Sequence, residues 1–548
     1  AGATTAPYTV AINQDTEEEE GNETFSVTLS NATAGLTIST PIFTYTIRDA
    51  PYLGYSGPGG VGDALTNYLW LKADDLTGLS NGDDVLNWPD LSGNGNAVSQ
   101  PNASFSPIYI TTGLNGLPVV RFNKTNNRIR KVGVSKAIPS NWNRNDLSII
   151  YVNKTTDSNE GLISYAGELE TEGYLLNNSA NVRLSKTNQN YPSGQIFNDN
   201  TFHITGLSYN VVSSRDYLDF WKDGLYTPVA QTITGDEFSF GRQIELDGTL
   251  AIGGQQGAGS SGDTRDTGYT AATAFEGDFA EVIIYDDQLN TAEMTIIFNY
   301  LAAKYNLTIT DDFYAYEGTH AHDVAGVGRA NSSAEHTKAM SAGVLIVESG
   351  SGLDADGEYL IFGHDNADFT SWTTAEAPNG DGNSQRMARE WRLNETGDVG
   401  TVTIEIDATQ LPTLPQDHTM YALMVDSDGD FSSGAQVYEP ISDFGGIYSY
   451  EIDINNGDYV SIAAVNPTVT HSASTGTGLE SQDATIEVSL NYITADDFSV
   501  NVTTSNGTGV AGEDFVGTDQ KVVTIAANTT STTYLVSIIQ DIILEGDE

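Results

Sequence analysis

The sequence predicts an all-β, multidomain protein. Short apolar runs alternate with polar residues along most of the chain, as is typical of strands with one buried face. Glycine occurs 55 times, and turns rich in glycine and asparagine separate the runs. With 548 residues the chain is too long for one ordinary core, so several domains are expected.

Composition limits the partners and the chemistry. The chain has 74 acidic and 23 basic residues, a formal net charge of −51, which repels nucleic acid phosphates and anionic lipid headgroups. Carboxylates suit Ca²⁺, so calcium is the expected cofactor, and a merely soluble acidic surface is the alternative. The absence of cysteine excludes disulfides and thiolate chemistry. The sequence also has no apolar run long enough to span a bilayer.

The two ends of the chain share a pattern. Residues 8–23 read YTVAINQDTEEEEGNE, and residues 534–548 read YLVSIIQDIILEGDE. Two alternating runs follow the first copy and none follows the second. Residues 467–548 and 24–50 together have about the length of a seven-stranded sandwich. We therefore predict one period of a head-to-tail array, in which the neighbouring period completes a split sandwich. A duplicated strand motif is the alternative.

The C-terminal piece resembles the Calx-beta family. It contains GLESQDATIEVSL and SNGTGVAGEDFVG, and residues 506–517 carry the Gly-Thr, Ala-Gly and Asp-aromatic elements in the family's order. The resemblance implies an immunoglobulin-like sandwich, divided between residues 467–548 and 1–50, with acidic loops that hold Ca²⁺. The ligands that it implies are Glu480, Asp514, Asp541 and Glu545, with Asp15, Glu20 and Asp49 in the N-terminal part.

Residues 51–66 are rich in glycine and proline without periodicity, so they are expected to form a linker. The segment contains a GxGxxG match from Gly57 to Gly62. A dinucleotide fingerprint needs a strand before the glycines and a helix that begins on them, and the sequence indicates neither. We interpret the match as chance.

Residues 67–309 contain YLWLKADDLTG, VLNWPDLSGNGNAV, NGLPVVRF and FEGDFAEVIIYDDQLNTAEM in that order. Together these phrases resemble the laminin-G/concanavalin-like jelly roll of bacterial surface proteins. One helix is predicted after them, packed against the edge of the sandwich, because Asn290 can cap it and Glu293 completes a capping box. The residues at helical spacing are Met294, Ile297, Phe298, Leu301 and Tyr305.

Residues 310–466 return to short strands and are expected to form a further β-rich module. Asn456-Gly457 stands between two alternating runs, which predicts a hairpin there. The segment resembles an uncharacterised module that follows such jelly rolls in large secreted bacterial proteins. That resemblance implies a position in the chain and no activity.

Catalytic motifs are incomplete. Jelly-roll glycosidases use E-x-D-x-x-E, but the stretches that begin at Glu405 and Glu451 end in Gln410 and Asn456, so the second catalytic carboxylate is missing. We interpret both as solvated strand faces. Ser80 lies in a GxSxG match without a following helix, which indicates a turn serine.

Two stretches are candidate metal sites. His320 and His322, with Asp323 nearby, would offer transition-metal ligands on one strand face, and a surface loop is the alternative. The stretch DSDGDF has three carboxylates at alternate positions, which suits Ca²⁺. They are Asp426, Asp428 and Asp430. The sixth and twelfth EF-hand positions hold Phe431 and Val437, so a bare acidic turn is the alternative.

Tryptophans offer flat rings for stacking on sugars. Trp88 lies in a phrase of the jelly-roll family and is expected to be structural. Trp142, Trp221 and Trp372 stand beside polar residues and are freer to be exposed. A glycan site is therefore an open alternative without an assigned location.

Taken together, these features predict a non-enzymatic repeat unit of a long extracellular protein at a bacterial cell surface, stiffened by calcium. The resemblances are similar to those of giant adhesins of gliding or biofilm-forming bacteria. The expected partners are neighbouring repeats. The alternatives are a carbohydrate-binding protein that acts through the jelly roll, and a polysaccharide-degrading enzyme.

Overall fold

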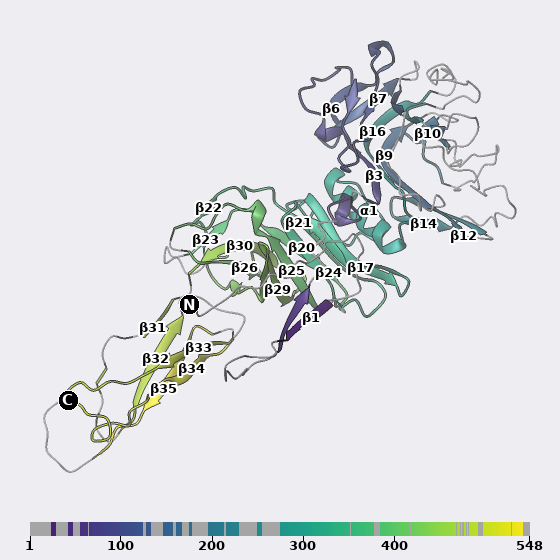
Figure 1. Ribbon diagram of the computed structural model, residues 1–548. Coiled ribbons are helices and arrows are strands. Elements are labelled where there is room, and N and C mark those ends of the chain that lie inside the picture. Colours follow the sequence, from purple (N-terminus) through teal and green to yellow (C-terminus); the bar gives the residue numbers. More distant parts are fainter. Residues whose placement is uncertain are drawn as a thin grey trace, which may run out of the picture. The chain divides into compact units, whose positions relative to one another are not determined.

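The computed structural model shows two compact units, Ala1–Gly54 and Tyr55–Glu548 (Figure 1). The residues that it describes are 23–28, 42–47, 55–63, 65–123, 128–132, 146–156, 161–166, 175–177, 195–212, 215–228, 249–254, 274–350, 352–377, 384–416, 418–466, 468–471, 473, 476–477, 479, 482–490, 497–527 and 529–540. Strands dominate these residues, and α1 is their one α-helix, so the predicted all-β fold is confirmed.

The N-terminal unit contains two strands, β1 (Glu23–Thr28) and β2 (Ile42–Ile47). They pair antiparallel, with Phe25 opposite Tyr45. Directly opposite residues of an antiparallel pair lie on the same face. The register therefore places the aromatic positions of both strands together on one face and the Thr and Ser positions on the other.

The first part of the larger unit consists of two sheets. An eight-stranded sheet has the order β14-β13-β12-β9-β16-β7-β6, with β3 also paired to β16, and a six-stranded sheet has the order β11-β10-β15-β8-β5-β4. Buried side chains of both sheets form one core, which includes Trp88, Phe122 and Phe279. The bounds are β3 (Asn67–Lys72), β4 (Asn87–Trp88), β5 (Val98–Ser99), β6 (Ile108–Leu114), β7 (Leu117–Asn123), β8 (Ile129–Val132), β9 (Asp146–Thr155), β10 (Gly161–Ala166), β11 (Leu175–Asn177), β12 (His203–Val212), β13 (Arg215–Lys222), β14 (Leu225–Pro228), β15 (Thr249–Ile252) and β16 (Glu276–Tyr285).

The predicted helix is confirmed as α1 (Thr291–Tyr305). The Asn290 side-chain oxygen accepts hydrogen bonds from the backbone N–H groups of Ala292 and Glu293, at 2.8 and 3.2 Å. The Glu293 carboxylate in turn accepts from the Asn290 N–H at 2.8 Å, which completes the capping box. The helix ends at Asn306, which has the left-handed conformation common at C-termini.

Helix α1 is buried on two sides rather than lying at one sandwich edge. On one side Phe298 packs against the eight-stranded sheet, where a Cβ at Gly206 would lie 2.9 Å from its ring. On the other side the same apolar cluster continues into Val324 and Ile361 of the following strands. The edge position expected from the sequence is therefore wrong, because the helix forms part of a core that both sandwiches share.

A second pair of sheets follows α1. A nine-stranded sheet has the order β18-β17-β21-β24-β30-β23-β22, with β26 paired to β27 and β30, and a five-stranded sheet has the order β19-β20-β25-β29-β28. One buried cluster joins them. The bounds are β17 (His322–Asn331), β18 (Ala334–His336), β19 (Lys338–Ser341), β20 (Leu345–Glu348), β21 (Glu358–His364), β22 (Trp372–Thr373), β23 (Gln385–Met387), β24 (Trp391–Thr396), β25 (Thr401–Asp407), β26 (Met420–Asp426), β27 (Gln436–Tyr438), β28 (Ser442–Phe444), β29 (Ile447–Asp453) and β30 (Tyr459–Val465).

The hairpin predicted at Asn456-Gly457 is wrong. Strand β29 pairs with β25 and β28 in one sheet, whereas β30 pairs with β23, β24 and β26 in the other, so the turn links two sheets. The Asn456 side-chain oxygen accepts hydrogen bonds from the Asn394 side chain and the Glu395 N–H, at 3.1 and 3.2 Å. These contacts tie the turn to β24 and hold the two strands apart.

Part of the predicted linker is packed. Residues 55–63 contain a short 3-10 turn, η1 (Pro58–Gly60), whose residues are buried. The Tyr285 hydroxyl donates to the Val61 carbonyl at 2.9 Å, and the His336 ring lies 3.1 Å from the Gly60 carbonyl. The segment contacts α1, β17 and β19 and leads into a strand, so its glycines do not open a dinucleotide-binding helix.

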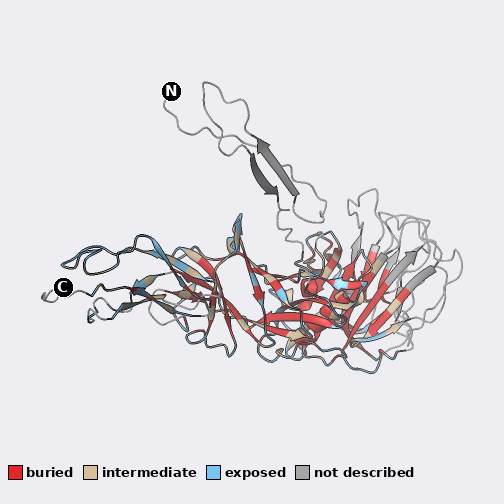
Figure 2. Cartoon of the chain, turned by 90° about the horizontal axis from the view of Figure 1, so that it is seen from below, coloured by how far each residue is buried: buried red, intermediate tan, exposed pale blue. Residues whose placement is uncertain are grey.

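Five strands lie near the C-terminus, as a three-stranded sheet β31-β32-β35 and a two-stranded sheet β33-β34. Their shared core is small and contains Val488, Leu490, Val523 and Ile525. In Figure 2 these strands are mostly intermediate or exposed, whereas the strands around α1 are mostly buried. The bounds are β31 (Val469–His471), β32 (Ala484–Leu490), β33 (Phe498–Val502), β34 (Lys521–Ile525) and β35 (Ser531–Val536).

Candidate functional site

The acidic loop after β26 is folded by its own carboxylates. Asp426 is 5% exposed, and its Oδ1 accepts from the N–H groups of Asp428 and Gly429, at 2.8 and 2.7 Å. Asp428 caps the next turn through the Asp430 N–H at 2.9 Å, and Asp430 accepts from Ser432. Burial and the neighbouring Asp428 raise the pKa of Asp426, whereas hydrogen bonds from Ser432 lower the pKa of Asp430.

Among the described residues, no three or more histidine or acidic side chains are grouped as metal ligands. At the two EF-hand positions, Phe431 and Val437 are fully buried in a small apolar cluster. The loop thus stands as three successive turns capped by Asp426, Asp428 and Asp430. Calcium binding there stays a prediction.

One of the Calx-beta ligand positions can be placed. Asp514 is partly buried, and its Oδ2 accepts from the Val510 N–H at 2.6 Å. Its carbonyl accepts from the Ile539 N–H at 2.8 Å, which brings the loop to the residues after β35. The other expected ligands lie outside the described residues; they are Glu480, Asp541, Glu545, Asp15, Glu20 and Asp49.

The predicted histidine pair does not converge. His320 precedes β17, is 5% exposed and packs edge-on against Tyr459, and burial lowers its pKa to about 4. His322 instead stacks on His364 of β21, with ring centroids 5.8 Å apart. Sequence spacing missed His364 because sheet pairing, not chain proximity, brings it to His322.

His364 is a structural histidine. It is 1% exposed, its Nε2 lies 2.9 Å from Asp323 Oδ2, and its Nδ1 accepts from the Asn366 N–H at 3.0 Å. Because Nδ1 is an acceptor, Nε2 carries the proton and donates it to Asp323. Burial lowers the pKa of His364 despite this carboxylate. With both nitrogens in use, the ring has no free position for a nucleophile or a metal.

The incomplete catalytic motifs have structural roles. Glu405 lies 3.2 Å from the Lys338 ammonium, and Asp407 accepts from the Thr409 N–H at 2.9 Å to cap a short turn. Glu451 is exposed on β29, as predicted. Ser80 is exposed, and its N–H donates to the Asp83 carboxylate at 2.7 Å, which makes it the predicted turn serine.

A buried carboxylate links α1 to the first sandwich. Glu281 of β16 is 0% exposed and its two oxygens accept from four donors. Oε1 accepts from Trp70 Nε1 at 2.6 Å and from the Tyr300 hydroxyl at 3.0 Å. Oε2 accepts from Lys304 Nζ at 2.8 Å and from the Tyr305 hydroxyl at 2.9 Å. We call these five residues, with Asp74, the Glu281 cluster.

The Glu281 cluster has no free valence for chemistry. Lys304 also reaches Asp74 at 2.9 Å, just after β3. Burial alone would lower the pKa of Lys304, but Glu281 and Asp74 outweigh it and raise that pKa, so the ammonium form is held. Burial and Glu281 raise the pKa of Tyr300. The cluster therefore fixes the last turn of α1 to β3 and β16.

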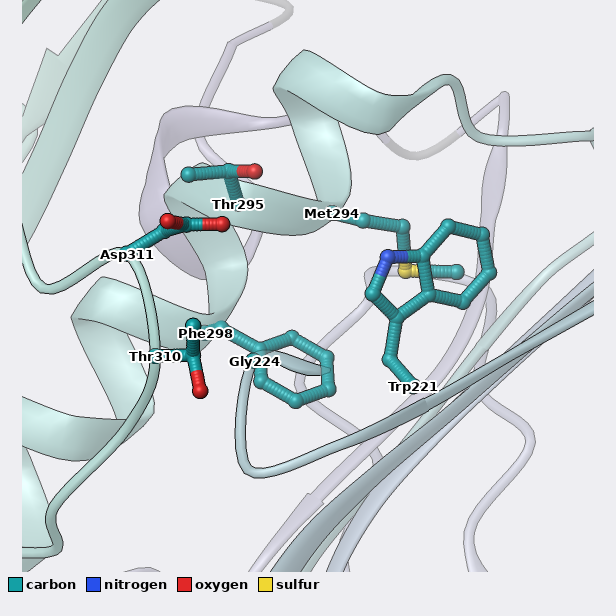
Figure 3. A pocket seen from close by; sticks show the side chains of 7 residues that line it. All are labelled: Trp221, Gly224, Met294, Thr295, Phe298, Thr310 and Asp311. Carbon is teal, nitrogen blue, oxygen red and sulfur yellow. The ribbon is translucent and has the colours of Figure 1, made fainter. Parts of the chain in front are cut away.

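A small cavity lies where β13 meets α1 (Figure 3). Met294 and Phe298 of the helix face the indole of Trp221, and Asp311 lies near the opposite end. The free volume is about 10 Å³, roughly the space for one water molecule. A sugar ring does not fit there.

The predicted aromatic platforms differ in exposure. Trp221 is 4% exposed and packs on Tyr226, so its expected exposure is wrong. Trp372 is half-buried and donates to the Thr413 carbonyl at 2.9 Å. Trp142 lies outside the described residues.

His203 is held between two carboxylates in the first sandwich. It is 6% exposed, its Nδ1 lies 2.7 Å from Asp223, and its Nε2 lies 2.9 Å from Asp199. Burial lowers the pKa of His203, but the hydrogen bonds to Asp223 and Asp199 outweigh it and raise that pKa above the usual value.

This geometry predicts a pH-dependent first sandwich. Because the pKa of His203 is higher in the folded than in the unfolded chain, its contribution is complete below about pH 6.5 and is lost as the pH rises through the folded value. We expect the loss to be about 1 kcal/mol of unfolding free energy. Calorimetry should show a transition that falls with pH in the wild type and in the exposed-site control His471→Gln, but less in His203→Gln. Equal slopes in all three would contradict the assignment.

Two sequence families match parts of the chain. The Calx-beta domain matches residues 1–51 and 468–548, and a domain of unknown function, DUF8202, matches residues 293–458. A search of curated proteins found no match. Within the described residues, no helix is long and apolar enough to cross a bilayer.

Similar solved structures are all distant. A Trypanosoma rangeli sialidase with the inhibitor DANA has 12% identity and a TM-score of 0.26 over 42% of this chain, which covers 32% of the sialidase. The binding domain of botulinum neurotoxin DC with rat synaptotagmin II has 10% identity and a TM-score of 0.25, over 87% and 95% of the two chains. An endo-1,3-β-glucanase from Streptomyces sioyaensis has 12% identity and a TM-score of 0.18, over 41% and 92%. These values are too low to support a functional comparison. The chain therefore combines Calx-beta sequence near both ends with an all-β fold and a domain of unknown function.

Proposed function

We propose that this chain is a non-enzymatic repeat unit of a long extracellular surface protein, which gives the molecule reach and attaches a cell to a surface. The single observation that carries the proposal is the Calx-beta match in two separate pieces, residues 1–51 and 468–548, around other domains. Neighbouring units that share a sandwich form a continuous head-to-tail array.

The joint at α1 supports a role in reach. The helix is buried between both sandwiches, and the Glu281 cluster fixes its last turn to the first of them. The packed segment at residues 55–63 adds contacts to β17 and β19. A large apolar interface of this kind limits domain motion, so the two sandwiches are suited to transmit force as one rod.

The structural roles of Glu405, Asp407, Ser80 and His364 support a non-enzymatic unit. Each residue belongs to a sequence motif or cluster with catalytic or metal-binding potential. Each is occupied by an ion pair, a turn cap or a core contact.

Attachment is tested with beads that carry the full chain. We expect coated beads to resist flow on glass, polystyrene or glycan-coated surfaces better than beads with an equally acidic unrelated protein. Retention on glycan surfaces alone would favour the carbohydrate-binding alternative. Retention no better than the control on every surface would contradict an adhesive role.

Calcium is expected to stiffen the acidic loops. If the loops hold Ca²⁺, chelation removes ligand from the folded state and lowers the melting temperature. The measurement is a thermal melt of the full chain with calcium, with chelator, and with chelator followed by excess calcium. Replacing Asp428 by Asn should reduce the calcium-dependent shift, whereas the exposed control Glu451→Gln should keep it. Identical melts with and without chelator would refute calcium stabilisation.

A further inference from the structure

The C-terminal strands form a sandwich with one open side. On β33, Phe498, Val500 and Val502 point toward the small core but are only partly buried. Their neighbours Ser499 and Asn501 are exposed, as the alternation of a strand requires. The inward residues of β33 thus form an apolar row without full cover.

The open side is the free edge of β33. Among the described residues β33 pairs only with β34. The other edge of β34 is occupied, because Lys521 donates to the Leu535 carbonyl at 3.3 Å. The loop before β34 is also fixed beside β35, since the Val516 N–H donates to the Ser537 carbonyl at 2.8 Å. An added strand therefore finds unpaired backbone groups on β33.

The β1–β2 pair has the matching pattern. Its register places Phe25 opposite Tyr45 and Val27 opposite Phe43, so these four positions fall on one face. The opposite face holds Thr and Ser positions, including Ser26. A two-stranded sheet by itself is marginal in water, so such a pair needs an apolar partner.

We propose that β1 of a second copy of this chain pairs antiparallel with β33, so that its β1–β2 pair completes the C-terminal sandwich. This inference rests on the head-to-tail array proposed above. The occupant is a second copy because the Calx-beta family matches residues 1–51 as well as 468–548. In seven-stranded immunoglobulin-like sandwiches the third, sixth and seventh strands share a sheet in the order 3-6-7. With β31–β35 as strands one to five, β1 takes the sixth place, beside β33.

The completed sandwich has two sheets, β34-β33-β1-β2 and β31-β32-β35. Inward residues at Phe498 and Val500 then meet inward positions at Phe25 and Val27 on the same face. Outward Asn501 comes to lie beside one of the outward positions of β1, which are Thr24, Ser26 and Thr28. This parity follows from the two-residue period of strands and fixes which positions can be cross-linked.

The absence of native cysteine makes disulfide trapping unambiguous. Full-length N501C is mixed in separate experiments with T24C, S26C and T28C and oxidised mildly. The control partner is T470C, an exposed site on β31, which is the edge of the other sheet. We expect a disulfide-linked heterodimer with N501C in at least one mixture, and none with T470C. Circular dichroism confirms that each single-site surface variant stays folded.

Three outcomes would overturn the proposal. Heterodimers with T470C alone would assign the pairing to β31. Closure within one chain of the double variants T24C/N501C, S26C/N501C or T28C/N501C, without heterodimers in the mixtures, would show that the strands fold back. No disulfide in any combination would exclude the pairing. Bead retention needs no contact between copies, so lost pairing with intact retention would refute this inference alone, and the reverse would refute only the adhesive role.

Discussion

Replacing Glu281 by glutamine is expected to lower the free energy of unfolding by about 3–5 kcal/mol, the range for breaking a buried ion pair. The carboxylate is fully buried and accepts from four donors, including the Lys304 ammonium. Glutamine has nearly the same shape, but it removes the charge opposite Lys304. It also turns one acceptor into a donor that faces a Trp, Tyr or Lys donor.

The control is Glu451→Gln, which makes the same chemical change on an exposed strand position and should alter stability by less than about 0.5 kcal/mol. Denaturant unfolding of both variants and the wild type measures the difference. If the two substitutions have equal effects, the Glu281 cluster does not hold α1 to the first sandwich, and the rigid joint loses its main polar support.

Replacing Gly60 by alanine is expected to destabilise the joint by about 2–4 kcal/mol in total. Gly60 has φ +77°, which costs about 1–2 kcal/mol for a residue with a Cβ. The new Cβ would also lie 2.7 Å from the Ala339 Cβ and 3.0 Å from the Met340 nitrogen. Such overpacking adds about 1–3 kcal/mol, because the contacts are a short side chain and backbone that cannot move away.

Gly343→Ala separates the two effects. Gly343 has φ +70°, but nothing lies within 4 Å of its would-be Cβ. The control should therefore show the conformational cost alone, and Gly60→Ala should be worse by the overpacking cost. Thermal unfolding of both variants provides the test. Equal losses would mean that residues 55–63 behave as a linker rather than as a packed segment.

Local signals in the sequence predicted local structure well. The helix at Thr291–Tyr305 was predictable because its capping residues and apolar spacing lie within one segment. The all-β class was predictable for the same reason, since alternation is a short-range pattern. The incomplete motif at Glu405 correctly argued against a catalytic pair, because the missing carboxylate is visible in the sequence itself.

Features that depend on contacts between distant segments were not predictable. Asn456-Gly457 has the residues of a hairpin, but the pairing of β29 with β25 and of β30 with β26 decides its role. His364 lies far along the chain from His322 and meets it only across the sheet. Residues 55–63 look like a linker because their glycines and proline are chosen for close packing against α1, which no local period reveals.

The most direct test of the head-to-tail account is an electron microscopy structure of two copies joined end to end, in calcium. The account predicts that the β1–β2 pair of the second copy closes the sandwich formed by β31–β35 of the first. Density for β1–β2 within its own copy, with the β33 edge between copies left unpaired, would contradict a shared sandwich and with it the array.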